Sequence, residues 1–394
     1  MTPPQHPAPT QAHCNALAGG AKSADRRGVR GIAKMTGLSV ATVSRVINGA
    51  ANVAPATRQI VLDAIARAGF EPNPAARALS TRRSRVIGAL VPTLSHSIFS
   101  TFLNGIEREL ALYGYTLVVA TTDYQPAKEL ARARDLLGMG AEALIVSGAV
   151  RDAALEELIA GRDLPVVATS IYAPRGRLPT IGYDNRALGQ AALRYLHQLG
   201  HRQIAVLHGP TADNDRTRLR LAGVRAAASG ASALNLIETS LDAEGGAAAA
   251  RAALAAQPRC TALLCLSDVL ALGALFEARR AGVSVPAALS IMGFDDLDWA
   301  AMCDPPLTTL RLPTATMGER AARAVVERLE LGIEIASHRL DADIVVRAST
   351  APPRSSDQSS NQTAARDDPR ERRGVAKSGA RTTVKTLGDL NGEL

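Results

Sequence analysis

The stretch that decides the fold of the N-terminal region is GIAKMTGLSVATVSRVING, residues Gly31 to Gly49. Its apolar residues are spaced as in two short helices, over 32–35 and 40–48, with a glycine-containing turn between them. Ser39 stands where it can cap the second helix. A third helical pattern follows at 55–68, and the three helices make up a domain over 28–72. This spacing predicts a helix-turn-helix module.

The second helix of such a module enters the major groove of DNA. Within it, Val43, Val46 and Ile47 are spaced to pack the module, whereas Ala41 is small enough to let the helix approach DNA closely. We predict DNA contacts from Val40, Ala41, Thr42, Ser44, Arg45 and Asn48. The alternative is a three-helix bundle with no role in DNA binding.

Charge is concentrated around this module. Residues 1–85 carry 12 basic and 3 acidic side chains, whereas the whole chain has a net charge of +8. A basic head before a nearly neutral body is typical of a polyanion-binding module joined to a second binding module. The alternative is a solvated basic arm.

The segment NPAARALSTRRSR, residues 73–85, follows the module. Asn73 and the proline after it are placed as an N-cap and first helical residue, which predicts a short hinge helix that orders on DNA. Leu79 is its one large apolar side chain and suits a wedge in the minor groove. Asn73, Arg77 and Leu79 complete the predicted DNA contacts. The alternative is an ordinary linker.

From about residue 86 to 350 short apolar runs alternate with helical stretches. This alternation predicts an α/β core of two doubly wound lobes, with a ligand site at the carboxyl ends of the strands. The predicted strands are 86–91, 116–120, 143–147, 165–170, 204–208, 261–267 and 289–294.

The tails, the cysteine content and the hydropathy of the chain lead us to expect a cytoplasmic protein. Segments 1–27 and 351–394 are rich in Pro, Ser, Gly and charge, so we expect disordered tails. The four cysteines are too few and scattered for a disulfide framework. We find no apolar run long enough for a membrane span and no signal peptide in 1–20, so no membrane association is expected.

Neither a metal site nor a catalytic site is predicted. His197 and His201 are four residues apart, but Gly200 ends the helix between them, which favours a structural role. The aspartates around Asp295 lack a second cluster of ligands. The sequence carries no Ser/His/Asp signature, no HExxH pair and no GxGxxG that opens a βαβ unit. We therefore predict no enzyme activity and no cofactor.

Together, Gly31–Gly49, the hinge segment and the core resemble the lactose-repressor/galactose-repressor (LacI/GalR) family of bacterial transcription regulators. The matching core phrases are IGALVPTLSHSIFSTFLNGIE (87–107), GYDNRALGQAALRYLHQLGHRQIAVLHGP (182–210), SDVLALGALFEARRAGVSVPAALSIMGFDD (267–296) and PPLTTLRLP (305–313). The resemblance implies a helix-turn-helix head, a hinge helix and a core like that of periplasmic sugar-binding proteins.

The resemblance also implies an effector pocket between the lobes. By position it would be formed by Phe99, Asn214, Arg216, Arg220, Leu241, Ser267, Asp268 and Asp295. Aspartate accepts hydrogen bonds from sugar hydroxyls, and arginine binds carboxylate or phosphate. The alternative for each charged residue is an interlobe or surface ion pair. The phrases VPTLSHSIF and DRT resemble the gluconate-repressor branch, which favours a sugar acid as effector.

We therefore expect a transcription regulator, most simply a repressor, whose operator affinity changes when a small sugar-like molecule binds. It should be a homodimer on a palindromic operator, joined through the core lobes, with helix faces at 99–112 and 269–276 as candidates. The alternatives are a carbohydrate transport receptor, which has no use for the basic head, and a nucleotide-dependent dehydrogenase.

Overall fold

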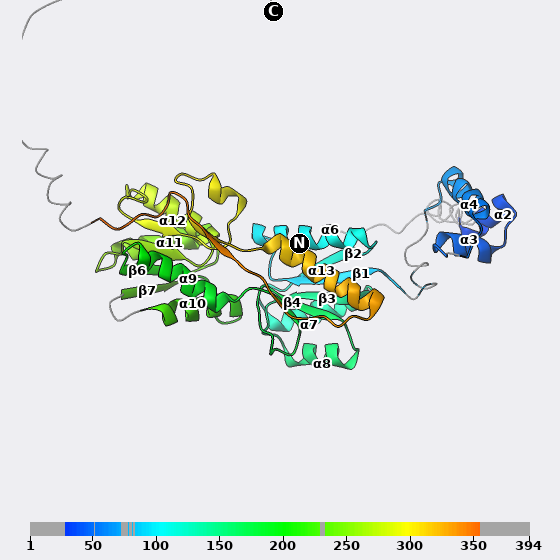
Figure 1. The fold of residues 1–394 in the computed structure, drawn as a ribbon, viewed down its shortest axis with the longest axis horizontal. Coiled ribbons are helices and arrows are strands. Elements are labelled where there is room, and N and C mark those ends of the chain that lie inside the picture. The colour runs from blue at the N-terminus through cyan, green and yellow to red at the C-terminus, as the bar shows by residue number, and fades with distance from the viewer. Residues whose placement is uncertain are drawn as a thin grey trace, which may run out of the picture.

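The computed structural model describes residues 28–50, 52–71, 78, 81, 83–228 and 233–354. It contains a helical head and two α/β lobes that lie side by side (Figure 1). Segment 1–27 and most of the predicted C-terminal tail lie outside the described residues, as do the predicted hinge contacts Asn73, Arg77 and Leu79.

The head is made of α2 (Val29–Thr36), α3 (Val40–Ile47) and α4 (Pro55–Ala68). The predicted cap of α3 is present, because Ser39 Oγ accepts a hydrogen bond from Thr42 N at 3.1 Å. At the end of α4, Gly69 adopts a φ of 56°, a conformation that favours glycine. The buried residues Ile32, Ala33, Val43, Val46, Val61 and Ala64 give this unit its own small core.

The first lobe is built on a six-stranded parallel sheet with the order β11-β5-β4-β3-β1-β2. Its strands are β1 (Val86–Val91), β2 (Thr116–Thr121), β3 (Ala141–Ser147), β4 (Val166–Thr169), β5 (Thr180–Gly182) and β11 (His338–Arg339). Its helices are α6 (Ser97–Leu112), α7 (Pro126–Gly138), α8 (Ala153–Gly161) and α13 (Thr314–Leu331). The central strands are buried, which explains their continuous apolar runs.

The second lobe contains a four-stranded parallel sheet with the order β7-β6-β8-β9. Its strands are β6 (Gln203–His208), β7 (Ala233–Glu238), β8 (Ala262–Cys265) and β9 (Ser290–Met292). Its helices are α9 (Asn185–Gln198), α10 (Asp215–Ala227), α11 (Ala243–Ala255), α12 (Asp268–Arg280) and the 3₁₀ helix η1 (Asp298–Ala301). The expected pair of doubly wound lobes is thus confirmed.

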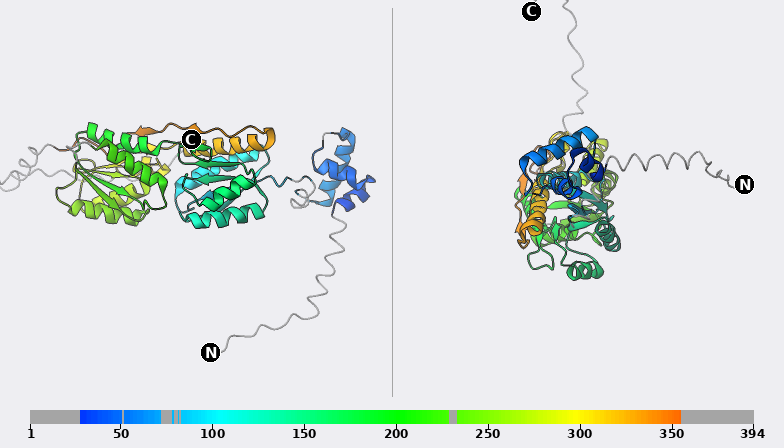
Figure 2. Two further views of the ribbon diagram at one scale, coloured as in Figure 1. Left: turned by 90° about the horizontal axis from the view of Figure 1, so that it is seen from below. Right: turned by 90° about the vertical axis from the view of Figure 1, so that its right-hand side faces the viewer.

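The chain crosses between the lobes three times, after β5, after the short strand β10 (Thr309–Arg311), and before β12 (Asp343–Val345). β10 and β12 pair in an antiparallel ribbon. The last crossing runs from the end of α13 back to the second lobe along one edge of the molecule (Figure 2).

Several elements were not predicted because their sequence signal is weak. β5 and β11 have three and two residues, too few for any periodicity. β7 is a half-exposed edge strand, so it lacks the continuous apolar run of its neighbours. α2 is also longer than the predicted 32–35. Within the described residues, no helix is long and apolar enough to cross a membrane.

His201 holds the end of the core in place. It is buried, and its Nδ1 lies 2.8 Å from Thr261 Oγ1. Its Nε2 lies 3.0 Å from Ser290 Oγ and 2.9 Å from the carbonyl oxygen of Ala351. Burial lowers the pKa of His201 below its usual value, so the neutral ring is the stable form. This geometry fits the structural role predicted for His201.

We predict that His201 contributes a fall in the free energy of unfolding as the pH drops from about 7.5 to about 5.5, because the unfolded chain then binds a proton at this residue more readily than the folded chain does. His201→Gln should lower stability at neutral pH by about 1–3 kcal/mol and make this pH dependence shallower. Urea unfolding at both pH values tests this, with the exposed His338→Gln as control. An unchanged pH dependence in His201→Gln would contradict it.

Candidate functional site

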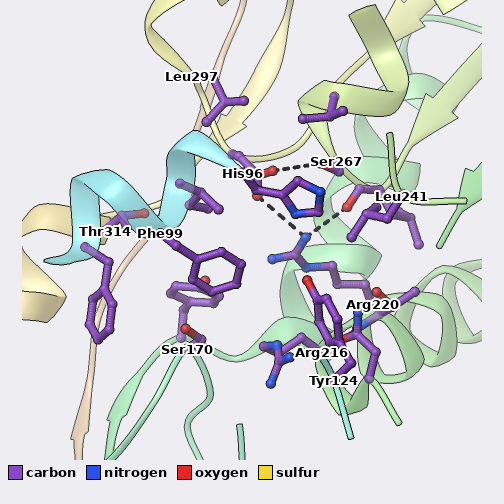
Figure 3. Close-up of a pocket in the computed structure, with 18 of the residues that line it drawn as sticks. His96, Phe99, Tyr124, Ser170, Arg216, Arg220, Leu241, Ser267, Leu297 and Thr314 are labelled. Atoms are coloured by element: carbon purple, nitrogen blue, oxygen red, sulfur yellow. Dashed lines mark hydrogen bonds and ion pairs between the residues drawn. The ribbon is translucent and has the colours of Figure 1, made fainter. Parts of the chain in front are cut away.

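A cleft lies between the two lobes, at the carboxyl ends of strands from both sheets (Figure 3). Seven of the eight residues predicted for the effector pocket line it: Phe99, Asn214, Arg216, Arg220, Leu241, Ser267 and Asp295. Chain segments far apart in sequence therefore meet here, as the parallel topology requires.

One wall of the cleft is aromatic. Phe99, in the first turn of α6, stacks on His96 with the ring centroids 6.4 Å apart. Burial lowers the pKa of His96, which keeps its ring neutral at neutral pH. In Figure 3 the ring of Phe99 lies on the α6 side of the cleft, and the side chain of Arg220 lies on the α10 side. This wall can pack against the apolar face of a ligand.

Arg220 lines the cleft and makes several contacts with its neighbours. Its Nε donates to Asn185 Oδ1 at 3.0 Å and its Nη1 donates to the carbonyl oxygen of Leu266 at 2.9 Å. The guanidinium lies over the ring of Phe294, 3.9 Å from the centroid. Its Nη1 is also 3.7 Å from Asp295 Oδ1, and both side chains are more than nine-tenths buried. The guanidinium therefore has polar partners at Nε and Nη1 and an aromatic ring against one face.

Two glycines allow α10, which carries Arg220, to pack closely against α9, the helix that follows the first connection between the lobes. A Cβ at Gly189 in α9 would overlap the backbone oxygen of Arg220, and one at Gly223 would overlap that of Arg186. α9 and α10 therefore pack backbone to backbone. Asn214 fixes the start of α10, because its Oδ1 accepts a hydrogen bond from Thr217 N at 3.2 Å.

Asp295 is the acidic group of the cleft. Its Oδ2 accepts a hydrogen bond from Ser267 Oγ at 3.0 Å. Burial raises the pKa of Asp295 to about 7, against the opposing effect of the Arg220 cation. Its backbone φ of 134° is rare for a residue with a side chain. Next to it, Asp296 anchors the loop through ion pairs of 2.7 Å to Arg311 and Arg347.

The prediction for Asp268 needs correction. The residue is fully buried and does not line the cleft. Its Oδ1 accepts a hydrogen bond from Thr309 Oγ1 at 2.6 Å and its Oδ2 accepts one from Leu297 N at 2.8 Å. Both oxygens thus join β10 and the loop after β9. Ser267 and Asp268 both follow the same strand, and only Ser267 faces the cleft.

Other lining residues were missed. They include His96, Tyr124, Ser170, Tyr183, Thr217, Thr314 and Met317. Ser170 follows β4 directly and Tyr124 comes three residues after β2, so the rule that ligands bind at strand carboxyl ends identifies both. Thr314 and Met317 begin α13, which returns to the first lobe after the second crossing, and no local pattern reveals that.

A second candidate surface lies on α3 in the head. Val43 and Val46 face the core, whereas Val40 is 46% exposed. Ala41 and Arg45 are also exposed, and Thr42, Ser44 and Asn48 are partly exposed. All six predicted DNA-contacting residues of this helix region therefore reach the surface. Within the described residues, no group of three or more His, Cys, Asp or Glu side chains is placed to hold a metal ion.

Comparisons with known proteins agree with this architecture. The family model "Bacterial regulatory proteins, lacI family" matches residues 29–73, and "Periplasmic binding protein-like domain" matches 193–350. The chain is 37% identical over 336 residues to the HTH-type transcriptional regulator reg1 of Streptomyces lividans, a match that covers 81% of this chain and 95% of the relative.

Solved structures show the same likeness. A lac repressor dimer bound to operator and the anti-inducer ONPF is 26% identical, with a TM-score of 0.72, over 81% of this chain and 98% of that chain. A LacI family transcriptional regulator from Enterococcus faecium with bound ribose is also 26% identical, with a TM-score of 0.61, over 68% of this chain and 100% of that chain.

We predict that Arg220→Met destabilises the core more at about pH 8 than at about pH 5.5. Without the Arg220 cation the pKa of Asp295 rises further, so at about pH 8 the folded variant must either take up a proton there or bury an unpaired charge, which costs up to about 3–5 kcal/mol. At low pH the carboxyl is protonated and the loss is smaller. Urea unfolding of the variant and of Arg132→Met, whose arginine is 51% exposed and pairs with the exposed Asp135, checks this. An equal loss at the two pH values would show that Arg220 does not stabilise the charged form of Asp295.

Proposed function

The chain belongs to the lacI family of bacterial regulatory proteins, and we propose that a small hydroxylated effector held between its lobes controls how tightly its head binds operator DNA. As a member of this family it is a DNA-binding transcription regulator and not an enzyme. Its site of action would be the cytoplasm, where the operator is found. The observation that carries the proposal is the interlobe cleft with Arg220, Asp295 and Ser267 opposite Phe99.

The head would bind DNA through the exposed side of α3. Arg45 is an exposed cation able to reach a guanine edge or a phosphate, while the small Ala41 allows close approach. The proposed contacts are Val40, Ala41, Thr42, Ser44, Arg45 and Asn48, with Asn73, Arg77 and Leu79 from the hinge segment. The operator would be a palindrome read by two heads.

The effector would be a sugar or a sugar acid. Asp295 and Ser267 can bind hydroxyl groups, and the arginines Arg216 and Arg220 can bind hydroxyls or a carboxylate. The aromatic wall at Phe99 would cover an apolar face of the same molecule. The ribose complex of a relative supports a sugar-like ligand. Asn214 and Leu241 would complete the lining.

Helix α13 offers a route from the cleft to the head. Its first turns contribute Thr314 and Met317 to the cleft. Near its other end, Glu330 binds the segment that leads to the head, with Oε1 3.1 Å from Arg83 Nη2 and 3.6 Å from Arg85 Nη2. A ligand that shifts α13 would therefore change how the linker leaves the first lobe.

The proposal is tested by selecting DNA from a random pool with the full chain and then measuring binding to the selected site with and without sugars and sugar acids. The expected result is a palindromic site whose affinity changes with one class of these compounds. Selection of only asymmetric sequences would overturn the proposal that the two heads of a dimer bind one palindromic operator. An affinity that no sugar or sugar acid alters would overturn the proposed effector class.

We predict that Arg45→Ala weakens binding to the selected site by about 1–3 kcal/mol, because a lost guanine contact costs that much. The control Arg132→Ala removes the same charge from the surface of the first lobe and should have little effect. Fluorescence anisotropy on operator and random DNA separates the two cases. An equal loss on both DNA sequences would show that Arg45 binds only phosphate.

A homodimer would form partly through an exposed apolar surface of the second lobe. Phe276 on α12 is 61% exposed and Met302 is 84% exposed, and the two line one hollow together with Leu272 and Trp299. Phe276 lies in the predicted face 269–276. Burying such large side chains against a second copy removes apolar surface from water.

We predict that Phe276→Glu shifts the protein from dimer to monomer, because a charge would be buried in the interface without a partner. Light scattering across a concentration series measures this. The control Met139→Glu alters an equally exposed apolar residue, 65% exposed, in the first lobe. If both variants keep the mass of the native chain, the dimer uses another surface.

A further inference from the structure

A second, smaller cavity adjoins the cleft at Tyr124 and Arg216, and we call it the rear compartment. It is lined from the first lobe by Thr122, Glu129 and Ser147 and from the second by Asp215, while Tyr124 and Arg216 line both cavities. These two side chains therefore form a partition between the cleft and the rear compartment. In Figure 3 they lie together at the edge of the cleft, below Arg220.

The rear compartment contains a polar atom without a partner. Ser147 Oγ, at the end of β3, is buried and has no hydrogen bond, the one such side-chain atom among the described residues. An unpaired buried hydroxyl costs free energy unless a water or a ligand binds it. The group is placed where the strand opens into the rear compartment.

Glu129 supplies a second group that a ligand can use. Its side chain is 8% exposed, and Oε1 lies 3.5 Å from Arg151 Nη1, a long contact for an ion pair. Burial raises the pKa of Glu129 above its usual value. The carboxyl thus has capacity for a closer hydrogen-bond donor than Arg151. Asp215, in contrast, is engaged, because Oδ2 accepts from Ala149 N at 2.6 Å and Oδ1 from Arg216 Nη1 at 3.0 Å.

The partition is built on unusual backbone. Asp123 and Tyr124 both adopt positive φ values, 50° and 58°, which cost free energy in residues other than glycine. The guanidinium carbon of Arg216 lies 5.8 Å from the centroid of the Tyr124 ring. A ligand that extends from the cleft into the rear compartment must pass between these two side chains. An open carbon chain is narrower than a sugar ring and would displace them less.

We propose that the rear compartment binds the hydroxylated end of an open-chain effector, a sugar acid or sugar alcohol, whose other end occupies the cleft. A terminal hydroxyl would donate to Glu129 and accept from, or donate to, Ser147. A carboxylate would meet Glu129 and Asp215 there, and the one cation that lines this compartment among the described residues, Arg216, is already paired with Asp215, so the acidic end would stay in the cleft with Arg220. This inference rests on the proposed function and names the ligand's shape and orientation.

The test is calorimetric binding of an aldonate series of increasing chain length, threonate, ribonate and gluconate, to the full chain, with glucose as the ring-form probe. Affinity should rise by about tenfold or more from the shortest to the longest aldonate, the size expected for one added hydrogen bond to a charged group. Ser147→Val and Glu129→Gln should each remove most of this gain and leave threonate binding within about twofold.

Matched controls are Ser100→Val and Glu157→Gln, which make the same changes at exposed positions and should keep the gain. A gain that survives in both rear-compartment variants would overturn the inference, as would tighter binding of glucose than of gluconate. Binding of none of the four compounds would overturn it as well. Operator binding of the same preparations, measured in parallel, shows whether the proposed regulator function fails independently.

Discussion

The buried pair of Arg220 and Asp295 is the interaction on which the cleft depends. Moving two charges out of water costs free energy, and the attraction between Arg220 and Asp295 at 3.7 Å offsets only part of this desolvation cost. The remainder comes from hydrogen bonds to Asn185, Leu266 and Ser267 and from the face of Phe294. The Arg220–Asp295 pair thus places charged groups among mostly apolar residues of the cleft. Such a pair can bind a polar ligand but contributes little net stability.

This pair also fixes which elements meet at the cleft. Arg220 comes from α10, Asn185 begins α9 directly after the first crossing, and Asp295 follows β9 shortly before the second crossing. In addition, Asn185 Nδ2 donates to the backbone oxygen of Ser170 in the first lobe at 2.9 Å. Arg220, which would bind the effector, is therefore connected to the first lobe through Asn185, so ligand binding and lobe position are physically linked.

Close packing extends this link through the first lobe. A Cβ at Gly105 in α6 would overlap the backbone of Ala315 in α13, and one at Gly318 in α13 would overlap the backbone of Phe102. The two helices touch backbone to backbone and are expected to move together. One end of this pair carries Phe99 and Met317 to the cleft. The other carries Glu330, which also accepts a hydrogen bond from Tyr115 Oη at 2.7 Å and contacts the start of the core.

The sequence by itself determined the features that depend on near neighbours along the chain. The helix-turn-helix could be predicted because a cap at Ser39, a glycine turn and the spacing of Val43 and Val46 are local signals. The buried central strands could be predicted from their continuous apolar runs, and the pocket residues Arg220 and Asp295 from their resemblance to a known family and their place after strands.

Only the tertiary structure decided the features that depend on which distant elements meet. The local sequence does not show that Ser267 faces the cleft while the adjacent Asp268 ties two loops together, because consecutive residues at a strand end point in different directions. The short strand β11 exists because it has a sheet edge to join. The unpaired hydroxyl of Ser147 and the partition formed by Tyr124 and Arg216 arise where the two lobes meet, and a linear pattern does not encode that contact.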